Sequence, residues 1–362
     1  METLAEGRMA TVMVSTNSAA ATVILVAVIT KGGTKVALVV GMVAQAAMVT
    51  TVGRVTEHFI EEQGSTDHEG AMTGWVTRFA PSPTGFLHLG HVASALFGWR
   101  YAQPNGTWFV RLEDIDPQRC KPDYATALLE DLAWLGLHSA KPVLYQSACL
   151  AEYAKTLQNL ERLGVIYPCF CTRSDIMRES AAIFSAPHTA PDGSLKYPGT
   201  CRALSTVQRA TLCAQGVPHV LRLDMEKACA LAQSQAPNGA WPLTYTDLER
   251  GTVVCKPELF GDVVLARRDV PASYHLCVTH DDARQGVTLV TRGEDLRPAT
   301  DLHCLLQTLM GWPRPHYAFH PLLCGADGKR LAKRDGAKAV RAMRAAGMSA
   351  QAVCQAAGFA GP

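Results

Sequence analysis

Short apolar segments alternate with amphipathic segments along the chain from Trp75 onward. The short apolar segments predict buried strands at 75–80, 107–113, 219–223, 252–255, 262–266, 274–278 and 287–291. The longer segments repeat apolar residues at helical spacing, which predicts helices at 89–102, 128–135, 148–163 and 299–310, and a helical tail beyond Gly336. This alternation predicts an α/β fold with a mainly parallel, doubly wound sheet of the Rossmann type, whose site lies at the strand ends.

The first 74 residues do not follow this pattern. Residues 18–53 form an apolar run of Ala, Val, Thr and Met that Lys31 and Lys35 interrupt, so each piece is shorter than the roughly 20 residues of a spanning helix. Glu2 and Glu6 lie where a signal peptide carries positive charge. We expect residues 1–74 to be an unstructured or mis-started extension, with Met72 as the natural start. A genuine appendage and a weak membrane anchor are the alternatives.

Composition narrows the class of protein. The 362 residues include 34 Lys and Arg against 32 Asp and Glu, a formal net charge of +2, and 48% are hydrophobic. This excludes a disordered, collagen-like or coiled-coil protein and suits one large or two ordinary domains. A net charge near zero neither supports nor excludes nucleic-acid binding, because a basic patch can exist on a nearly neutral protein. The twelve cysteines, of which only Cys169 and Cys171 are closely spaced, do not form a disulfide scaffold and predict a reducing, cytoplasmic compartment.

Two histidines flank a glycine at the start of the first predicted helix, in the sequence His88-Leu89-Gly90-His91. Residues three apart at a helix start share one face, and the glycine lets a ligand approach the backbone closely. Free N–H groups and positive potential at this helix end suit a phosphate chain. The alternatives are a capped helix with two surface histidines and a metal site, for which a third ligand is missing nearby. The preceding Pro-punctuated turn favours nucleotide binding.

A glycine-led basic loop near the C-terminus, 328–335 (GKRLAKRD), places four cations within six positions. Such a cluster is costly to hold together unless an anion neutralises it. The alternative interpretation is a solvated cluster of surface charges.

Taken together, these motifs resemble those of the class I aminoacyl-tRNA synthetases. The segment 78–91 (RFAPSPTGFLHLGH) resembles their HIGH region, and 330–334 (RLAKR) resembles their KMSKS loop. Further segments resemble the glutamate branch, namely FVRLEDIDPQR (109–119), DLAWLGL (131–137), YQS (145–147), SYHLCVTHDD (273–282) and GVTLVTRGEDL (286–296). The resemblance covers 75–340, with the motifs in the family's order, and it implies a class I synthetase catalytic core.

Only 28 residues follow Arg334, too few for a further domain with its own core, so we expect a short helical tail over 341–362 and no anticodon-binding domain. This short form resembles the glutamyl-Q tRNA(Asp) synthetase family. The resemblance implies activation of L-glutamate with ATP without tRNA, and transfer of glutamate to the queuosine base at the wobble position of tRNA(Asp). The alternatives are a truncated glutamyl-tRNA synthetase that charges tRNA(Glu) and a non-catalytic synthetase-like binding protein.

The same resemblance implies a glutamate site made of Arg78, Ala80, Ser82, Glu113, Tyr274 and Arg292. Glu113 would hold the substrate ammonium. An arginine suits a planar carboxylate because its guanidinium donates two parallel hydrogen bonds. Without the family context, Arg78 could equally be a surface strand end, and Glu113 could be a partner in a structural ion pair.

The implied ATP site consists of His88, Gly90, His91, Arg330 and Lys333. The two histidines and Lys333 would be the catalytic residues, because they stabilise charge on the phosphates. Mg²⁺ would accompany ATP without a dedicated protein cage. Ala332 stands where the KMSKS motif carries serine, so we expect weaker ordering of the loop rather than inactivity.

A zinc site is implied within an insertion over 165–203. Its ligands would be Cys169, Cys171, Tyr197 and Cys201, which complete a four-coordinate structural Zn²⁺ site. The gap between Cys171 and Tyr197 is longer than usual in the family, and His188 inside it could replace Tyr197.

Contacts with tRNA phosphates can be inferred only from charge. The candidates are Arg100, Arg119, Lys121, Arg202, Arg284 and Arg297. We expect a monomer without a membrane partner.

Overall fold

The structure is a computed structural model that describes residues 8–13, 24–30, 33–39, 74–182, 189–236, 241–323 and 339–362. In the three segments before residue 74 and in residues 180–182, it describes the backbone alone. The chain divides into two compact units, Met1–Glu69 and Gly70–Pro362.

The first unit contains three strands, β1 (Arg8–Met13), β2 (Ile24–Thr30) and β3 (Gly33–Val39). They pair antiparallel in the order β1-β2-β3. The sequence does not predict these strands, although Val, Ile and Thr in this region have a high strand propensity. That residues 1–71 have no folded role and precede the natural start stays a prediction.

The second unit is a mixed α/β structure. Its strands are β4 (Val76–Phe79), β5 (Thr107–Leu112), β6 (Leu144–Tyr145), β7 (Ile166–Cys169), β8 (Val220–Leu223), β9 (Thr244–Asp247), β10 (Gly251–Val254), β11 (Val264–Ala266), β12 (Leu289–Gly293) and β13 (His316–His320). Its helices are α1 (Leu89–Ala102), α2 (Pro122–Trp134), α3 (Leu150–Arg162), α4 (Arg173–Ala182), α5 (Thr206–Ala214), α6 (Met225–Gln235), α7 (Tyr274–Gln285), α8 (Ala299–Met310), α9 (Val340–Ala345) and α10 (Ala350–Ala356).

Parallel pairing dominates the strands that carry the site. Strands β4, β5 and β6 are parallel neighbours, and β12 is parallel to β13. Strand β4 also lies beside β12, because the Thr288 N–H donates to the Val76 carbonyl at 3.0 Å. The carboxyl ends of these strands therefore meet at one edge, where ligands bind in open α/β sheets.

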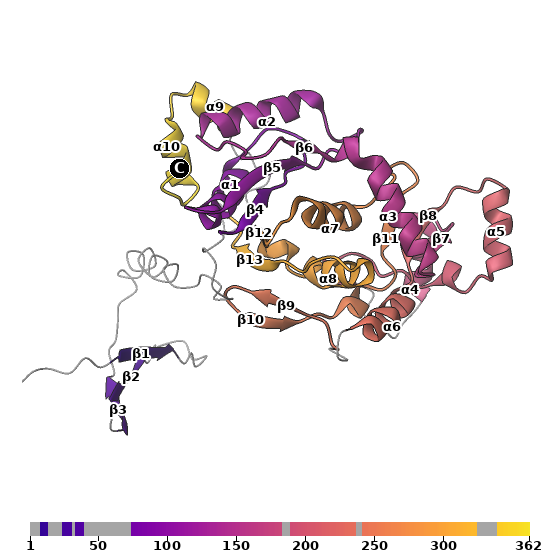
Figure 1. Cartoon of the computed structure of the whole chain (residues 1–362), viewed down its shortest axis with the longest axis horizontal. Helices are drawn as coiled ribbons and strands as arrows, with labels where there is room; N and C mark the ends of the chain where they lie inside the picture. The colour runs from indigo at the N-terminus through magenta and orange to yellow at the C-terminus, as the bar shows by residue number, and fades with distance from the viewer. Residues whose placement is uncertain are drawn as a thin grey trace, which may run out of the picture. The chain divides into compact units, whose positions relative to one another are not determined.

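Strand β5 shows why helices cover both faces of this sheet. Phe109 packs into one apolar cluster with residues of α3, α7 and α8. Trp108, Val110 and Leu112 pack into a second cluster with residues of α1, α2 and α10. Successive strand residues point to opposite faces, so β5 is buried on both sides. Figure 1 shows α2 on one side of strands β4 to β6 and the α7–α8 pair on the other. The α/β prediction is confirmed.

The prediction of a strand at 274–278 is wrong, because this stretch is the first turn of helix α7. Ser273 caps the helix by accepting a hydrogen bond from the Leu276 N–H at 3.4 Å. The buried face of α7 continues through polar residues, including Asp281 and Asp282. Those buried carboxylates break the apolar repeat that identifies a helix in the sequence.

The sequence also does not predict helices α4, α5 and α6, or strands β6, β7, β9 and β13. Of these elements, strand β13 contributes most to the candidate site. Its carboxyl end lies beside that of β12 and places His320 in the wall of a cavity. The described part of the tail is helical, as expected, and it forms α9 and α10.

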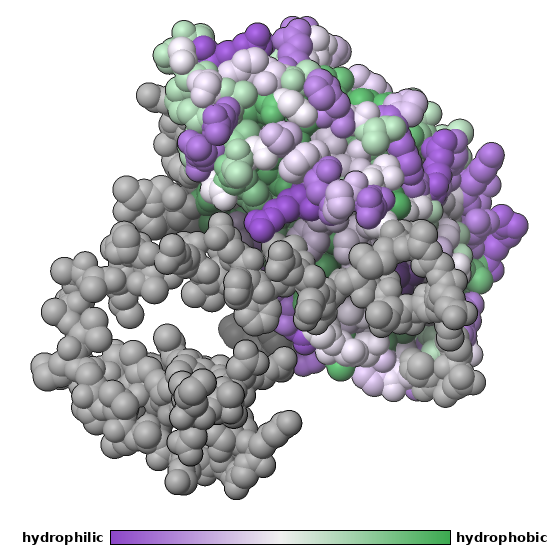
Figure 2. All heavy atoms as spheres, turned by 60° about the vertical axis from the view of Figure 1, so that its left-hand side comes forward, coloured by the Kyte–Doolittle hydropathy of each residue, from purple (hydrophilic) through white to green (hydrophobic). Residues whose placement is uncertain are grey.

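No helix in the described segments combines the length and the apolar character needed to cross a bilayer. The face of the molecule in Figure 2 mixes hydrophilic and hydrophobic residues wherever it is coloured.

Candidate active site

A cavity of about 540 Å³ lies where the carboxyl ends of β4, β12 and β13 meet the start of α1. Most of the predicted site residues line it, namely Arg78, Ala80, His88, Gly90, His91, Glu113, Tyr274 and Arg292. Ser82 is exposed and is not among the lining residues. Arg330, Ala332 and Lys333 lie outside the described residues. The structure thus brings the predicted glutamate site and the predicted ATP site together at one cavity. Ser82 does not line this cavity, and the basic loop lies outside the described residues.

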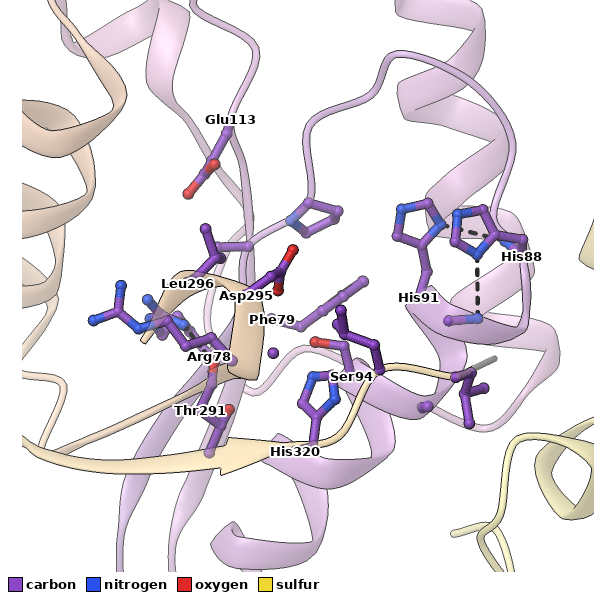
Figure 3. Close-up of a pocket in the computed structure, with 18 of the residues that line it drawn as sticks. Arg78, Phe79, His88, His91, Ser94, Glu113, Thr291, Asp295, Leu296 and His320 are labelled. Carbon is purple, nitrogen blue, oxygen red and sulfur yellow. Dashed lines mark hydrogen bonds between the residues drawn. The ribbon is translucent and has the colours of Figure 1, made fainter. Parts of the chain in front are cut away.

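Backbone hydrogen bonds determine which nitrogen carries the proton in each histidine of the His88–His91 pair. His88 is the N-cap of α1, and its Nδ1 accepts from the Gly90 N–H at 3.1 Å. The His91 Nδ1 accepts from the His88 N–H at 3.3 Å, as the dashed lines in Figure 3 show. A nitrogen that accepts cannot carry the proton, so each ring carries it on Nε2. Each Nε2–H is a donor suited to a phosphate oxygen.

Gly90 makes this arrangement possible. A Cβ at this position would lie 3.0 Å from Cε1 and 3.1 Å from Nδ1 of His88. Because these contacts are tighter than ordinary van der Waals distances, a side chain here would displace the His88 ring. The two imidazole rings stack with their centroids 3.8 Å apart.

Both ends of the segment that contains the basic loop lie at this cavity. Leu323, just before the segment, lines the cavity. Just after it, Ala339 forms a β-bridge with His88, and the Val340 N–H donates to the Leu87 carbonyl at 2.8 Å. The described residues on both sides of this segment therefore lie at the cavity or beside His88.

Arg78 is neutralised inside the protein. Its Nε and Nη2 donate to the two carboxylate oxygens of Asp282 at 2.8 and 3.1 Å, and Nη1 donates to the Thr291 carbonyl at 3.1 Å. Arg111 donates to the same Asp282 at 2.7 Å. Arg78 and Arg111 together lower the pKa of Asp282 against the effect of burial, which raises it. Asp281 lies near Arg111, with 4.0 Å between its Oδ2 and the arginine Nε.

Arg292 has different surroundings. Its Nη1 donates to the His303 Nδ1 at 3.2 Å, and its Nη2 donates to the Thr300 hydroxyl at 3.2 Å. Its Nε is buried and finds no hydrogen-bond partner among the described residues. No carboxylate of the described segments forms an ion pair with it. Arg292 is thus a buried cation, 4% exposed, whose charge no carboxylate of the described residues neutralises.

A chain of two neutral histidines supports Arg292. Since the guanidinium can only donate, His303 accepts at Nδ1 and carries its proton on Nε2, which lies 3.2 Å from the His275 Nδ1. Burial, and secondarily the charge of Arg292, lowers the pKa of His303 well below its usual value. Burial lowers the pKa of His275 to about 4. Both rings are therefore neutral at physiological pH.

Glu113 follows the end of β5 and projects into the space above Arg78 in Figure 3. Burial raises the pKa of its carboxyl to about 7, although Arg111 and Arg78 lower it. A carboxylate in this state gains an ammonium partner favourably, because that partner stabilises the ionised form. Tyr274, at the start of α7, lies beside the histidine chain with its ring 5.8 Å from that of His303.

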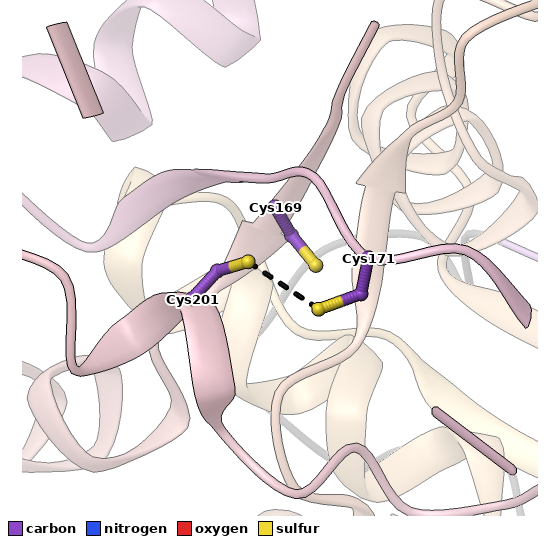
Figure 4. Close-up of side chains that lie close together, drawn as sticks. All are labelled: Cys169, Cys171 and Cys201. Atoms are coloured by element: carbon purple, nitrogen blue, oxygen red, sulfur yellow. Dashed lines mark hydrogen bonds between the residues drawn. The ribbon is translucent and has the colours of Figure 1, made fainter. Parts of the chain in front are cut away.

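A second cluster of side chains lies at the end of β7, outside the cavity (Figure 4). The sulfur atoms of Cys169, Cys171 and Cys201 all lie within 4.8 Å of one another. The Cys171 sulfur is 3.4 Å from that of Cys201 and 3.3 Å from the Tyr197 hydroxyl. The Phe170 N–H donates to the Cys201 sulfur at 3.3 Å. Three thiols and a phenol thus converge as the ligands of a tetrahedral metal site do.

The antiparallel sheet β11-β8-β7 supports this cluster. Arg222 of β8 places its guanidinium 4.0 Å from the centroid of the Tyr197 ring. His188, the alternative ligand, lies outside the described residues.

Sequence reasoning misses five residues that support or line the cavity. Arg111, Asp281 and Asp282 form the buried ion pairs, while His303 and His320 contact the site from α8 and β13. The adjacent carboxylates at 281 and 282 are a usable signal, because they lie within an otherwise apolar helix face. His303 and His320 have no comparable local signature.

Comparisons with known proteins agree with this geometry. The family of class I tRNA synthetases (E and Q), catalytic domain, matches residues 75–361. The glutamyl-Q tRNA(Asp) synthetase of Rhodobacter capsulatus is 44% identical over 280 residues, which cover 76% of this chain and 96% of that protein. The glutamate–tRNA ligase of Aquifex aeolicus is 35% identical over 280 residues, covering 76% of this chain and 55% of the ligase.

A solved structure agrees as well. The glutamate tRNA ligase from Elizabethkingia meningosepticum, in complex with its amino acid, superimposes with a TM-score of 0.59 at 29% identity. The match covers 73% of this chain and 52% of that one, so this chain spans about half the length of that ligase. The chain therefore belongs to the class I tRNA synthetases of the glutamate and glutamine branch, and it is a ligase of the aminoacyl-tRNA synthetase type.

Proposed function

We propose that this protein activates L-glutamate with ATP without tRNA, and transfers the glutamate to the queuosine base at the wobble position of tRNA(Asp). In the first step the α-carboxylate of glutamate attacks the α-phosphorus of ATP. A carboxyl O–P bond forms, the bond to the β-phosphate oxygen breaks, and pyrophosphate leaves. In the second step a hydroxyl of the base attacks the adenylate carbonyl, which releases AMP.

The observation that carries the proposal is the pairing of charges in the cavity. Arg292 is a buried cation without a carboxylate partner among the described residues, and Glu113 is a carboxyl that burial leaves half-protonated near pH 7. An amino acid with a side-chain carboxylate supplies a partner to each of these groups, a carboxylate to Arg292 and an ammonium to Glu113. The α-carboxylate must stay free to react, so Arg292 takes the side-chain carboxylate and Glu113 takes the ammonium.

ATP would lie between this end and the start of α1. The Nε2–H groups of His88 and His91 would donate to its phosphate oxygens, assisted by the helix N-terminus. Lys333 and Arg330 would neutralise the charge that develops on the leaving pyrophosphate. Mg²⁺ would bind with ATP, mainly through phosphate oxygens and water. No protein nucleophile is required, since the reaction depends on positioning and charge stabilisation.

The transfer to queuosine is supported by the relatives. Those named glutamyl-Q tRNA(Asp) synthetase match over most of their length, 96% for the Rhodobacter capsulatus protein and 85% for that of Nocardia farcinica. An unpaired anticodon base can be splayed out into a protein site, which is the common mode of sequence-specific RNA recognition. We further propose a monomeric, cytoplasmic protein.

A structural Zn²⁺ is part of the proposal. Cys169, Cys171, Cys201 and Tyr197 have the donor types and the mutual proximity that zinc requires. Bound zinc would link β7 to the segment that precedes β8 and so stabilise the insertion. It takes no part in the chemical steps above.

A second candidate function is the charging of tRNA(Glu) at its 3′ end. The 35% identity to the glutamate–tRNA ligase of Aquifex aeolicus favours it. Both candidates share the activation step and differ in the acceptor.

Glutamate-dependent ATP–pyrophosphate exchange without RNA tests the proposal. We expect exchange with the protein and glutamate alone, followed by transfer of radiolabelled glutamate to tRNA(Asp) that carries queuosine, and no transfer to tRNA(Asp) that lacks it. Exchange that requires tRNA(Glu), with labelling of its 3′ end, would establish the second candidate instead. Absence of exchange under both conditions would refute both.

Lys333→Ala provides the inactive control for this assay. Loss of a preorganised charge contact should slow exchange about 100-fold. Lys155→Ala, an exposed lysine on α3, is the matched substitution and should leave exchange unchanged.

A further inference from the structure

Besides Arg292 Nε, a second buried nitrogen in the cavity wall has no partner among the described residues. His320, the last residue of β13, lines the cavity and is 9% exposed. Its Nε2 is buried and forms no hydrogen bond with the described residues. Buried polar atoms of native proteins are nearly always hydrogen-bonded, so an unpaired one inside a ligand cavity indicates a partner that the ligand supplies.

The His320 ring is held in one orientation. Its Nδ1 lies 3.0 Å from the Pro321 carbonyl, which can only accept, so Nδ1 carries a proton. The ring packs edge-to-face against Phe97 of α1 with 5.3 Å between centroids. Burial lowers the pKa of His320, although Asp295 and Glu294 raise it, and the ring stays neutral. Nε2 is therefore a lone-pair acceptor with a defined direction.

This acceptor lies in a part of the cavity suited to a nucleoside. Figure 3 shows the His320 ring beside Ser94, at the strand ends and across from Phe79. The lining residues nearby include the Asp295 carboxylate and four apolar residues that would pack against a purine, namely Leu296, Pro321, Leu322 and Leu323. The ionised triphosphate of ATP offers only acceptors, and the ammonium of glutamate is assigned to Glu113. Among the groups of ATP and glutamate, the two substrates of the first step, the remaining donors are the adenine 6-amino group and the ribose hydroxyls.

We propose that His320 recognises the nucleoside part of ATP by accepting, at Nε2, a hydrogen bond from the adenine amino group or a ribose hydroxyl. The inference rests on the proposed function, since that function makes ATP the nucleotide. His320 is a specificity-determining residue, because a nucleotide that lacks the donor leaves Nε2 buried and unpaired.

Calorimetric titration of the full chain with Mg·ATP, without glutamate or RNA, tests this directly. His320→Phe keeps a ring but removes the acceptor, and it should raise the Kd of ATP about tenfold. His320→Gln supplies a carbonyl acceptor and should restore part of the affinity. His138→Phe, an exposed histidine after α2, is the matched control and should bind like the parent protein.

Analogues identify the donor. The parent protein should bind one of purine riboside triphosphate, 2′-deoxy-ATP and 3′-deoxy-ATP about tenfold more weakly than ATP. The His320→Phe protein should bind that analogue and ATP alike. Parent-like ATP affinity in both folded His320 variants, or equal losses for every analogue in parent and variant, would overturn the inference. Loss of glutamate-dependent exchange alongside an intact His320 effect would refute the proposed function only.

Discussion

Two arginines reach the same cavity in opposite electrostatic settings. Arg78 forms a buried, two-pronged ion pair with Asp282. Arg292 meets the neutral acceptors His303 and Thr300, and no carboxylate of the described residues neutralises it. A buried charge is costly when unpaired, and Asp282 offsets that cost for Arg78, whereas Arg292 has no carboxylate partner among the described residues. Charge balance thus distinguishes the two arginines where residue type does not.

Asp282→Ala should have the largest effect of the variants considered, because it removes the carboxylate partner of Arg78 and leaves this arginine, like Arg292, without an ion pair. It leaves both Arg78 and Arg111 buried without their shared anion, which should lower the free energy of unfolding by about 3–5 kcal/mol. Urea unfolding followed by fluorescence measures the change. Asp269→Ala removes a surface carboxylate from an ion pair of similar length, 2.9 Å, and should leave stability close to that of the parent protein. Equal losses in both variants would contradict the distinction.

Arg292→Gln should show the converse behaviour, a large loss of activity with little loss of stability. Loss of the guanidinium should lower kcat/KM for glutamate in pyrophosphate exchange about 100- to 1000-fold, since a buried charged contact contributes about 3–4 kcal/mol. Stability should stay unchanged or increase, because an unpaired buried cation is removed. Arg162→Gln, at the exposed end of α3, controls for the substitution. A large loss of stability with little change in kcat/KM would reverse the roles assigned to the two arginines.

The pH dependence of glutamate binding tests Glu113, the residue that we assign to the ammonium of the substrate. Glu113 has a pKa of about 7 in the free site and must be ionised to hold an ammonium. Affinity should therefore be full above pH 8 and fall about tenfold for each pH unit below 7. Calorimetric titration with glutamate alone between pH 5.5 and 8.5 avoids the titration of ATP.

The Glu113→Gln variant is the control for this titration. It should bind glutamate weakly and almost independently of pH. His275 and His303 stay neutral throughout this range, because burial lowers the pKa of both. The same slope in the variant would assign the titration to another group.

His303→Ala should have the smallest effect. It removes one acceptor that orients Arg292, which should raise KM for glutamate about three- to tenfold and leave kcat nearly unchanged. His303→Asn supplies an oxygen near the position of Nδ1 and should recover most of the affinity. A loss that Asn does not rescue would mean that His303 acts through packing alone.

The sequence predicts the parallel strands β4, β5 and β12 because each is short and rich in aliphatic, aromatic or β-branched residues. It fails at α7, where polar residues occupy the buried face of the helix. It misses β13 as well, whose pattern His-Tyr-Ala-Phe-His resembles no apolar run. These failures concern the site, since α7 carries Asp282 and β13 carries His320. Burial of polar side chains removes the periodicity on which sequence interpretation depends.

The sequence by itself determined the local geometry of the His88–His91 pair at the start of α1. His88, Gly90 and His91 lie within four residues, and hydrogen bonds inside that short segment orient both rings. Only the tertiary structure decided how the two arginines differ. Arg78 gains its carboxylate partner from a distant element, whereas the partners of Arg292 lie only 8 and 11 positions along the chain. Asp282 lies 204 positions from Arg78 in the chain. Such pairings depend on how α7 packs against the sheet, and a local pattern of residues carries no information about that contact.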